Sequence, residues 1–182
     1  MAINGERVLA VIPARGGSKR APRKNIRLFR GQPLVSWAVH AARASRYIDD
    51  YILSTEDREI KDIGLLLNVA VLDRPAELAT DTASAEDVLR HALEIYPSDW
   101  VVLLQPTSPL RTAADIDACI EKALSNGSAA LTVNERGHKN GAVYVASKEW
   151  IAAHDFSHAG YAKFVMPDER SLDIDYPEQF DA

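Results

Sequence analysis

The sequence predicts an α/β fold with a doubly wound, mostly parallel sheet, built as one domain over residues 1–182. Short apolar runs alternate with amphipathic stretches along the chain, a pattern typical of successive βαβ units. The connections between them are short, so right-handed crossovers are expected. A length of 182 residues and a 47% share of hydrophobic residues suit a single domain with a buried core.

Hydrophobic periodicity predicts each element in order. The first strand, residues 8–12, is a continuous apolar run that ends at Pro13, as expected for a strand buried on both faces of a parallel sheet. Further strands are expected at residues 51–54, 69–72, 100–104, 129–133, 142–146 and 164–166. Helices are expected from Leu34 onward and at residues 57–68, 84–96, 112–124 and 149–153, with Ser84 and Thr112 as N-caps.

The predicted fold also indicates where a ligand would bind. In doubly wound sheets, ligands lie beyond the carboxyl ends of the strands, near the point where the strand order reverses. The segments that follow strands are residues 14–25, 73–84 and 105–112, and residues 171–177 are a further candidate. We therefore expect the functional residues in these four segments.

Composition excludes several classes of protein. The formal net charge is −5, from 21 basic and 26 acidic residues, which argues against a general nucleic-acid-binding protein. Cys119 is the only cysteine, so an internal disulfide or a zinc site built on several thiolates is impossible. No apolar run approaches the roughly 18 residues that cross a bilayer, and residues 1–7 lack the pattern of a signal peptide. We expect a cytoplasmic protein with no membrane partner.

The loop after the first strand concentrates positive charge. Residues 15–30 contain seven of the 21 basic residues and none of the 26 acidic ones. Gly16 and Gly17 are expected to adopt positive φ and to let the backbone approach a ligand, and successive amides in such a turn form an anion-binding nest. The loop adds one hydroxyl and three cations close by: Ser18, Arg15, Lys19 and Lys24. This combination predicts a polyphosphate site.

The loop matches neither of two familiar phosphate motifs. A P-loop requires Ser or Thr directly after its lysine, whereas Lys19 is followed by Arg20. The dinucleotide-binding pattern Gly-x-Gly-x-x-Gly is absent as well. From the residues alone, a solvated basic surface loop and a nucleic-acid patch remain alternatives. Phe29 is the only aromatic residue in the run, so base stacking is disfavoured.

Two further segments carry polar candidates. Asp173 and Asp175 lie two residues apart, so in an extended segment both carboxylates face one side, where Mg²⁺ would suit them. A solvated acidic tail is the alternative. In the loop at 105–111, Gln105 and Thr107 offer polar groups at the carboxyl edge of a strand, although an ordinary proline-stiffened loop explains this pattern equally well.

Three other features are interpreted as structural. Cys119 lies in an expected helix with no histidine–aspartate arrangement around it. His154 and His158 are four residues apart, a metal-ligand spacing, but no third ligand is evident. Tyr144 is interpreted from the pattern alone as a core aromatic residue.

Seven sequence blocks, in order along nearly the whole chain, resemble a known family. They lie at residues 12–25, 54–57, 74–78, 81–84, 103–111, 140–144 and 173–176, and the first reads Ile12-Pro-Ala-Arg-Gly-Gly-Ser-Lys-Arg-Ala-Pro-Arg-Lys-Asn25. This set resembles the acylneuraminate cytidylyltransferases, also called CMP-sialic acid synthetases, and their relatives for legionaminate and pseudaminate. The resemblance implies a Rossmann-like nucleotidyltransferase fold.

The resemblance also implies a role for each site residue. Nucleotide-binding roles fall on Ala14, Arg15, Gly16, Gly17, Ser18, Lys19, Asn25, Arg74 and Ser84. Acceptor-binding roles fall on Gln105, Thr107, Asn140 and Tyr144. The metal site of the family, here expected to hold Mg²⁺, falls on Asp173 and Asp175. Arg15, Lys19 and Lys24 are the expected catalytic residues, because their charges would stabilise the transition state of phosphoryl transfer.

One departure from the family bears on assembly. Family members carry a long insertion after the strand that corresponds to residues 129–133. It forms an arm that pairs with a second subunit and supplies cations to the neighbour's acceptor site. Here only residues 134–139 precede the block at 140–144. We therefore expect a monomer or an atypical dimer, with Arg136, His138 or Lys139 as candidates to replace the missing cations.

The chain also ends soon after residue 176, where relatives continue into a helix, so we expect an unusual acceptor or reduced activity.

The expected function is transfer of CMP from CTP to a 2-keto sugar acid, a sialic acid or a related nonulosonic acid, with release of pyrophosphate. Two alternatives belong to other classes. One is a nucleotide-binding module of the same fold that has lost catalysis. The other is a single-strand nucleic-acid binder, which the scarcity of aromatic residues in the basic loop disfavours.

Overall fold

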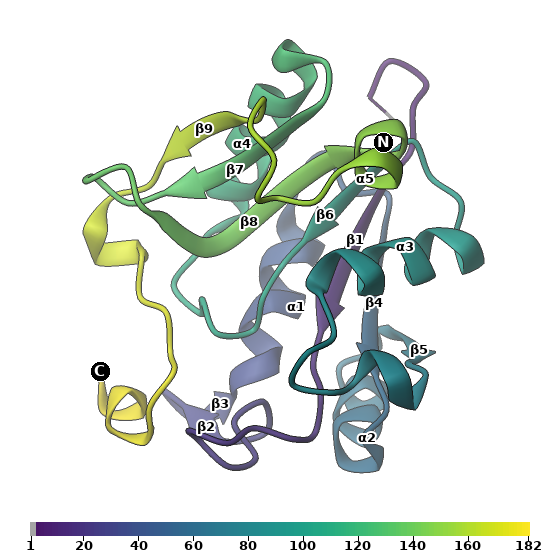
Figure 1. Cartoon of the computed structure of the whole chain (residues 1–182). Coiled ribbons are helices and arrows are strands. Elements are labelled where there is room, and N and C mark those ends of the chain that lie inside the picture. The colour runs from purple at the N-terminus through teal and green to yellow at the C-terminus, as the bar shows by residue number, and fades with distance from the viewer. Residues whose placement is uncertain (1–2) are drawn as a thin grey trace.

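A seven-stranded sheet with helices on both faces forms the body of the protein (Figure 1). The structure is a computed structural model that describes residues 3–182. The strands of this sheet are β1 (Val8–Pro13), β4 (Asp50–Thr55), β5 (Ala70–Asp73), β6 (Trp100–Leu103), β7 (Ala129–Val133), β8 (Lys139–Ser147) and β9 (Ala162–Val165). The α-helices are α1 (Leu34–Ala44), α2 (Arg58–Leu66), α3 (Ala85–Ile95), α4 (Ala113–Asn126) and α5 (Lys148–Ala153).

The strand order confirms the predicted α/β class. The order is β5-β4-β1-β6-β8-β7-β9, and only the pairs that β8 makes with β6 and β7 are antiparallel. The chain runs from β1 to β4 and β5 on one side, then crosses back to β6 on the other side of β1. The strand order therefore reverses between β1 and β6, where a ligand crevice is expected.

Different helices cover the two faces of the sheet. Along β1, Ala10 and Ile12 belong to a buried apolar cluster that includes residues of α1, α2 and α4. The intervening Leu9 and Val11 belong to a second cluster with residues of α3 and α5. Because side chains alternate across a strand, a run that is apolar at every position is needed to fill both faces. This accounts for the continuous apolar pattern of the first strand.

The helix starts follow the predicted capping chemistry. Ser84 accepts a hydrogen bond from the Asp87 backbone N–H at 3.0 Å, and Thr112 forms a reciprocal capping box with Asp115. The sequence did not predict the small hairpin of β2 (Leu28–Phe29) and β3 (Gln32–Pro33). Its turn places Arg30 and Gly31 at φ of 49° and 83°, as a two-residue hairpin turn requires.

The C-terminal segment crosses the molecule from β9 to the β2–β3 hairpin (Figure 1, yellow). It contains two short 3₁₀ turns, η2 (Asp168–Arg170) and η3 (Pro177–Asp181). At its end, the Arg30 side chain donates to the Ala182 carbonyl at 3.3 Å. Within residues 3–182, no helix combines the length and apolar character needed to span a membrane.

Candidate active site

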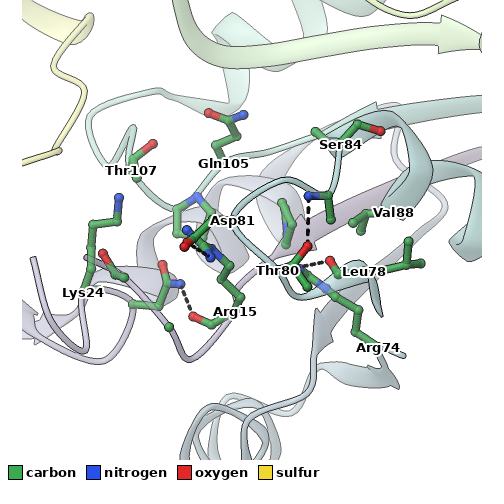
Figure 2. A pocket seen from close by; sticks show the side chains of 17 residues that line it. Arg15, Lys24, Arg74, Leu78, Thr80, Asp81, Ser84, Val88, Gln105 and Thr107 are labelled. Atoms are coloured by element: carbon green, nitrogen blue, oxygen red, sulfur yellow. Dashed lines mark hydrogen bonds and ion pairs between the residues drawn. The ribbon is translucent and has the colours of Figure 1, made fainter. Parts of the chain in front are cut away.

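A cavity of about 250 Å³ opens at the carboxyl edge of the sheet, where the strand order reverses. We call it the first cavity. Its walls come from residues within 13–25, 74–88 and 105–107, which overlap the three segments expected to carry the site, at 14–25, 73–84 and 105–112. Figure 2 shows Lys24 and Thr107 at one end of this cavity and Ser84 and Val88 at the other. The predicted location of the site therefore coincides with a real depression.

Most of the predicted nucleotide-side residues line this cavity. The lining includes Arg15, Gly17, Ser18, Lys24, Asn25, Arg74 and Ser84. Ala14 and Gly16 are not among its lining residues: Ala14 is buried, and its N–H donates to the Ser54 carbonyl at the end of β4. Lys19 lies outside the lining as well, but it is exposed and reaches a residue of the lining, Asp81.

The two glycines of the basic loop differ from the prediction. Neither adopts positive φ, so that part of the prediction is wrong. Gly16 is required by a protein contact: its N–H donates to Glu56 at 2.6 Å, and a Cβ there would lie 2.4 Å from the Asp57 carboxylate. Gly17 has open space around it and faces the cavity. Only Gly17 therefore leaves room for a close ligand.

The loop is anchored on the start of α2. Arg23 donates to both carboxylate oxygens of Asp57, at 2.7 and 2.9 Å, and Asp57 also caps α2 by accepting from the Ile60 N–H. Arg23 itself has φ of 56°, the positive-φ residue of this turn. The hydrogen bonds from Arg23 lower the pKa of Asp57 below its usual value. The anchor fixes the loop before any ligand binds.

Asp81 occupies the cationic side of the cavity. Its two carboxylate oxygens accept from Arg15 at 2.6 Å and from Lys19 at 2.8 Å (Figure 2 shows the Arg15 contact). These two hydrogen bonds, Lys19 first, lower the pKa of Asp81. A phosphate group that approached Arg15 and Lys19 would compete with this carboxylate. Asp81 lies in the segment 73–84, where functional residues were expected, but the sequence did not predict this contact.

Arg74 and Asn25 hold the cavity walls together. Arg74 is 7% exposed and donates to the Ser54 side chain and carbonyl, at 3.2 and 2.9 Å, and to the Leu78 carbonyl. Burial lowers its pKa from the ordinary arginine value. Asn25 donates to the Arg15 carbonyl at 3.0 Å, which fixes the basic loop beside the cavity.

Asp173 and Asp175 are not among the residues that line the first cavity, but Asp175 contacts the basic loop, where Arg20 donates to it at 3.2 Å. Between them, Ile174 is fully buried in an apolar cluster with Phe29, and its N–H donates to the Thr107 carbonyl at 2.8 Å. Asp173 and Asp175 flank this anchored residue, and both are partly exposed. Lys24, a cavity residue, lies 3.9 Å from Asp175.

The charges around the two aspartates suit a divalent cation. Burial raises the pKa of Asp173 despite a hydrogen bond from Thr107, and the neighbouring Asp175 carboxylate raises it further. Two carboxylates that repel each other next to a cavity form a donor set of hard oxygens. Within the described residues, no group of three His, Cys, Asp or Glu side chains forms a metal cage. Such a site fits Mg²⁺, which binds one or two carboxylates together with substrate phosphates and water.

Two side chains that the sequence reasoning missed hold this segment in place. Arg170 donates to both oxygens of Asp115, at 3.0 and 2.8 Å, and so ties η2 to the start of α4. Gln179 accepts from the backbone N–H groups of Asp175 and Tyr176, at 2.7 and 2.8 Å. It also donates to the Asp173 carbonyl at 2.9 Å. Neither residue has a distinctive motif, because these contacts depend on where the C-terminal segment crosses the fold.

A second cavity of about 240 Å³ adjoins the first. The two share Ala85 and Gln105 as wall residues. The other residues that line this second cavity are Glu86, Leu103, Lys139, Tyr144, Phe156 and Ser157. Of the four residues predicted to contact an acceptor, Gln105 and Tyr144 lie here, whereas Thr107 lines the first cavity.

Asn140, the fourth, is held inside the protein instead. It is 7% exposed and lines neither cavity. Its side-chain oxygen accepts from Thr132 at 2.6 Å and from the Ala142 N–H at 3.1 Å, and its amide donates to Ser171 at 3.1 Å. These contacts join the β7–β8 pair to the C-terminal segment, which gives Asn140 a structural role that the sequence did not reveal.

Arg111 is buried and connects the loop at 105–111 to strand β8. It donates to the Ala142 carbonyl on β8 and to the Gln105 carbonyl, the latter at 3.0 Å. Burial lowers its pKa to about 9, so the side chain stays charged at neutral pH. The loop at 105–111 is therefore fixed to β8 by this arginine as well as stiffened by its prolines.

Of the features interpreted as structural, Cys119 and the His154–His158 pair line neither the first nor the second cavity. Cys119 is fully buried in α4, and burial raises the pKa of its thiol. His154 and His158 stack with ring centroids 3.9 Å apart, a face-to-face arrangement rather than a converging ligand pair. Tyr144 packs against Phe156 at 4.9 Å between centroids, so it is both a packing residue and a cavity wall.

Comparison with known proteins assigns the chain to a family. A solved structure of CMP:2-keto-3-deoxy-manno-octonic acid synthetase in complex with CTP superposes with a TM-score of 0.81, covering 96% of this chain and 95% of that one at 13% identity. This similarity confirms the Rossmann-like nucleotidyltransferase fold. The family model for cytidylyltransferases matches residues 9–164. The chain belongs to the cytidylyltransferase family.

Two curated relatives refine the comparison. The chain is 40% identical over 126 residues to a pseudaminic acid cytidylyltransferase of Campylobacter jejuni, covering 66% of this chain and 54% of the relative. It is 29% identical over 207 residues to an N-acylneuraminate cytidylyltransferase of Escherichia coli O18:K1:H7, covering 93% and 49%. The chain thus spans about half the length of these relatives. The second alignment is longer than the 182 residues of this chain, so the relative contains residues that have no counterpart here.

Proposed function

We propose that this chain transfers CMP from CTP to a 2-keto sugar acid of the nonulosonic class, such as a sialic acid, and releases pyrophosphate. The observation that supports the proposal is that the cationic loop lines the first cavity and also contacts Asp175, which lies 3.2 Å from Arg20 and 3.9 Å from Lys24. Membership of the cytidylyltransferase family and the relatives that act on such acids support the choice of substrates.

The residues of the first cavity would bind and orient the nucleotide. Arg15, Lys19 and Lys24 would hold the triphosphate and stabilise the charge that builds up on it in the transition state. Ser18 and the open backbone at Gly17 would supply further donors to the phosphates. Arg74 and Ser84 would fix the remainder of the nucleotide at the other end of the cavity.

The second cavity would hold the acceptor next to the α-phosphate. In the reaction, the anomeric hydroxyl oxygen of the acid forms a bond to the α-phosphorus and gives up its proton to water, while the bond from that phosphorus to the bridging oxygen of the β-phosphate breaks. Pyrophosphate then leaves. Asp173 and Asp175 would hold Mg²⁺, which neutralises phosphate oxygens and lowers the pKa of a bound hydroxyl. Gln105, in the wall common to both cavities, would position the acceptor.

A pyrophosphate-release screen tests this proposal. Four nucleoside triphosphates are combined with several nonulosonic acids, with and without Mg²⁺. We expect release only with CTP, a sugar acid and Mg²⁺ together. The Lys19→Ala variant should lose about 10²–10³-fold in turnover without unfolding, whereas Lys122→Ala, which changes an exposed lysine of α4, should match the wild type.

Two results would contradict the proposal. Near-normal release by Lys19→Ala would remove the role of the basic loop. A thermal shift with CTP but no pyrophosphate with any acid would instead identify a nucleotide-binding module that does not catalyse transfer.

A further inference from the structure

Lys139 is the only cation among the residues that line the second cavity. It lies at the first position of β8, directly after the short turn that follows β7. The cavity walls around it are aromatic and polar, and they include Tyr144, Phe156 and Gln105. An ammonium group in such a cavity would attract a negatively charged group of a ligand.

The lysine is held in position but not neutralised. Its ammonium donates to the Phe156 carbonyl at 2.5 Å and lies 5.0 Å from the ring centroid of Tyr161. In residues 3–182, no ion pair joins it to an acidic side chain. The carboxylate that shares the cavity, Glu86, accepts from the Phe156 N–H at 3.0 Å. Lys139 therefore retains donors and a charge for a ligand.

The neighbouring basic residues cannot take this place. Arg136 and His138 belong to the exposed turn after β7, where their backbone N–H groups donate to the Asn134 side chain. Neither of them lines the first or the second cavity. The sequence left these three residues as equal candidates, and only Lys139 reaches a cavity.

We propose that Lys139 binds the carboxylate of the acceptor acid and so determines that the substrate is an acid rather than a neutral sugar. The inference rests on the proposed function, in which the second cavity holds the acceptor. An ammonium group offers three donors and a carboxylate only accepts, so the pair is complementary. The rings of Tyr144 and Phe156 would pack against the carbon skeleton of the sugar, and the shared wall residue Gln105 would place it next to the nucleotide.

The test compares a sugar acid with its neutral methyl ester. The probe is N-acetylneuraminic acid or whichever nonulosonic acid supports the fastest turnover, and its dissociation constant from the CTP-loaded protein is measured by calorimetry. We expect the wild type to bind the ester about tenfold or more weakly than the acid. Lys139→Met should bind both equally weakly, with an unchanged KM for CTP, and Lys139→Arg should recover part of the discrimination. Arg136→Gln is the matched control and should behave as the wild type.

The outcomes separate this inference from the proposed function. If Lys139→Met still prefers the acid over the ester as strongly as the wild type does, the inference is overturned, even when turnover is normal. Failure of the wild type to bind the acid also overturns it. If the wild type discriminates through Lys139 but releases no pyrophosphate, the lysine assignment stands and the proposed transferase activity fails.

Discussion

The adjacent glycines Gly16 and Gly17 should respond oppositely to the same substitution. In Gly16→Ala, the new Cβ would lie 2.4 Å from an Asp57 oxygen and 2.9 Å from its carboxyl carbon. Asp57 cannot move away freely, because it is bound by both nitrogens of Arg23 and caps α2. Forcing an extra methyl group into a fixed contact typically costs about 1–3 kcal/mol. In Gly17→Ala, no atom lies within 4 Å of the new Cβ, and the backbone does not adopt positive φ.

Thermal unfolding measures this contrast. Each kcal/mol corresponds to about 2–4 °C in the Tm of a domain of this size. We expect Gly16→Ala to lower the Tm by several degrees and Gly17→Ala to leave it unchanged or raise it slightly, since the alanine restricts the unfolded chain. Gly17→Ala should instead weaken CTP binding, because Gly17 lines the first cavity and the added methyl group would occupy open space beside it. Equal Tm values for the two variants would refute the assignment of Gly16 to a protein contact and Gly17 to a ligand contact.

Two further variants probe the electrostatics of the site. Asp81→Asn should tighten CTP binding in calorimetry, because a triphosphate no longer competes with a carboxylate for Lys19; weaker binding would show that Asp81 helps to bind the nucleotide. Arg170→Leu should lower the free energy of unfolding by about 1–3 kcal/mol, because it leaves the buried carboxylate of Asp115 with fewer donors, and it should slow pyrophosphate release by freeing the segment that carries Asp173. Burial raises the pKa of Asp115, but the hydrogen bonds that this carboxylate accepts, those from Arg170 foremost, and the charge of Arg170 together outweigh burial, and the pKa is lowered. The pair therefore contributes its full stabilisation above about pH 4, and this contribution is lost as the pH falls through the lowered pKa. Stability measured from pH 7 down to pH 2 should therefore fall less steeply in Arg170→Leu than in the wild type, and parallel curves would contradict this linkage.

The sequence predicted the parts of the fold that depend on local pattern. A strand buried on both faces must be apolar at every position, which made residues 8–12 recognisable without any partner strand. Helix starts were visible because Ser84 and Thr112 are side chains that cap a helix. The spacing of Asp173 and Asp175 predicts a common face for an extended backbone, and the structure shows both residues partly exposed on either side of the buried Ile174.

The rest depended on contacts between distant segments. Asp81 lies more than 60 positions from the cations it contacts, and nothing in its neighbourhood in the sequence marks it as their partner. Gly16 looked like a ligand-contacting glycine, but the carboxylate of Asp57 is the group that requires it. Asn140 fell in a motif, yet its amide is used inside the protein. Such assignments need the three-dimensional packing and do not follow from spacing.

A crystal structure with CTP and Mg²⁺ would test the central claim most directly. It should show the triphosphate within hydrogen-bonding distance of Arg15 and Lys19, with Asp81 displaced from them, and a metal ion bound jointly by a phosphate oxygen, Asp173 and Asp175. A nucleotide bound elsewhere, or a metal that leaves both aspartates uncoordinated while CTP fills the first cavity, would contradict the account.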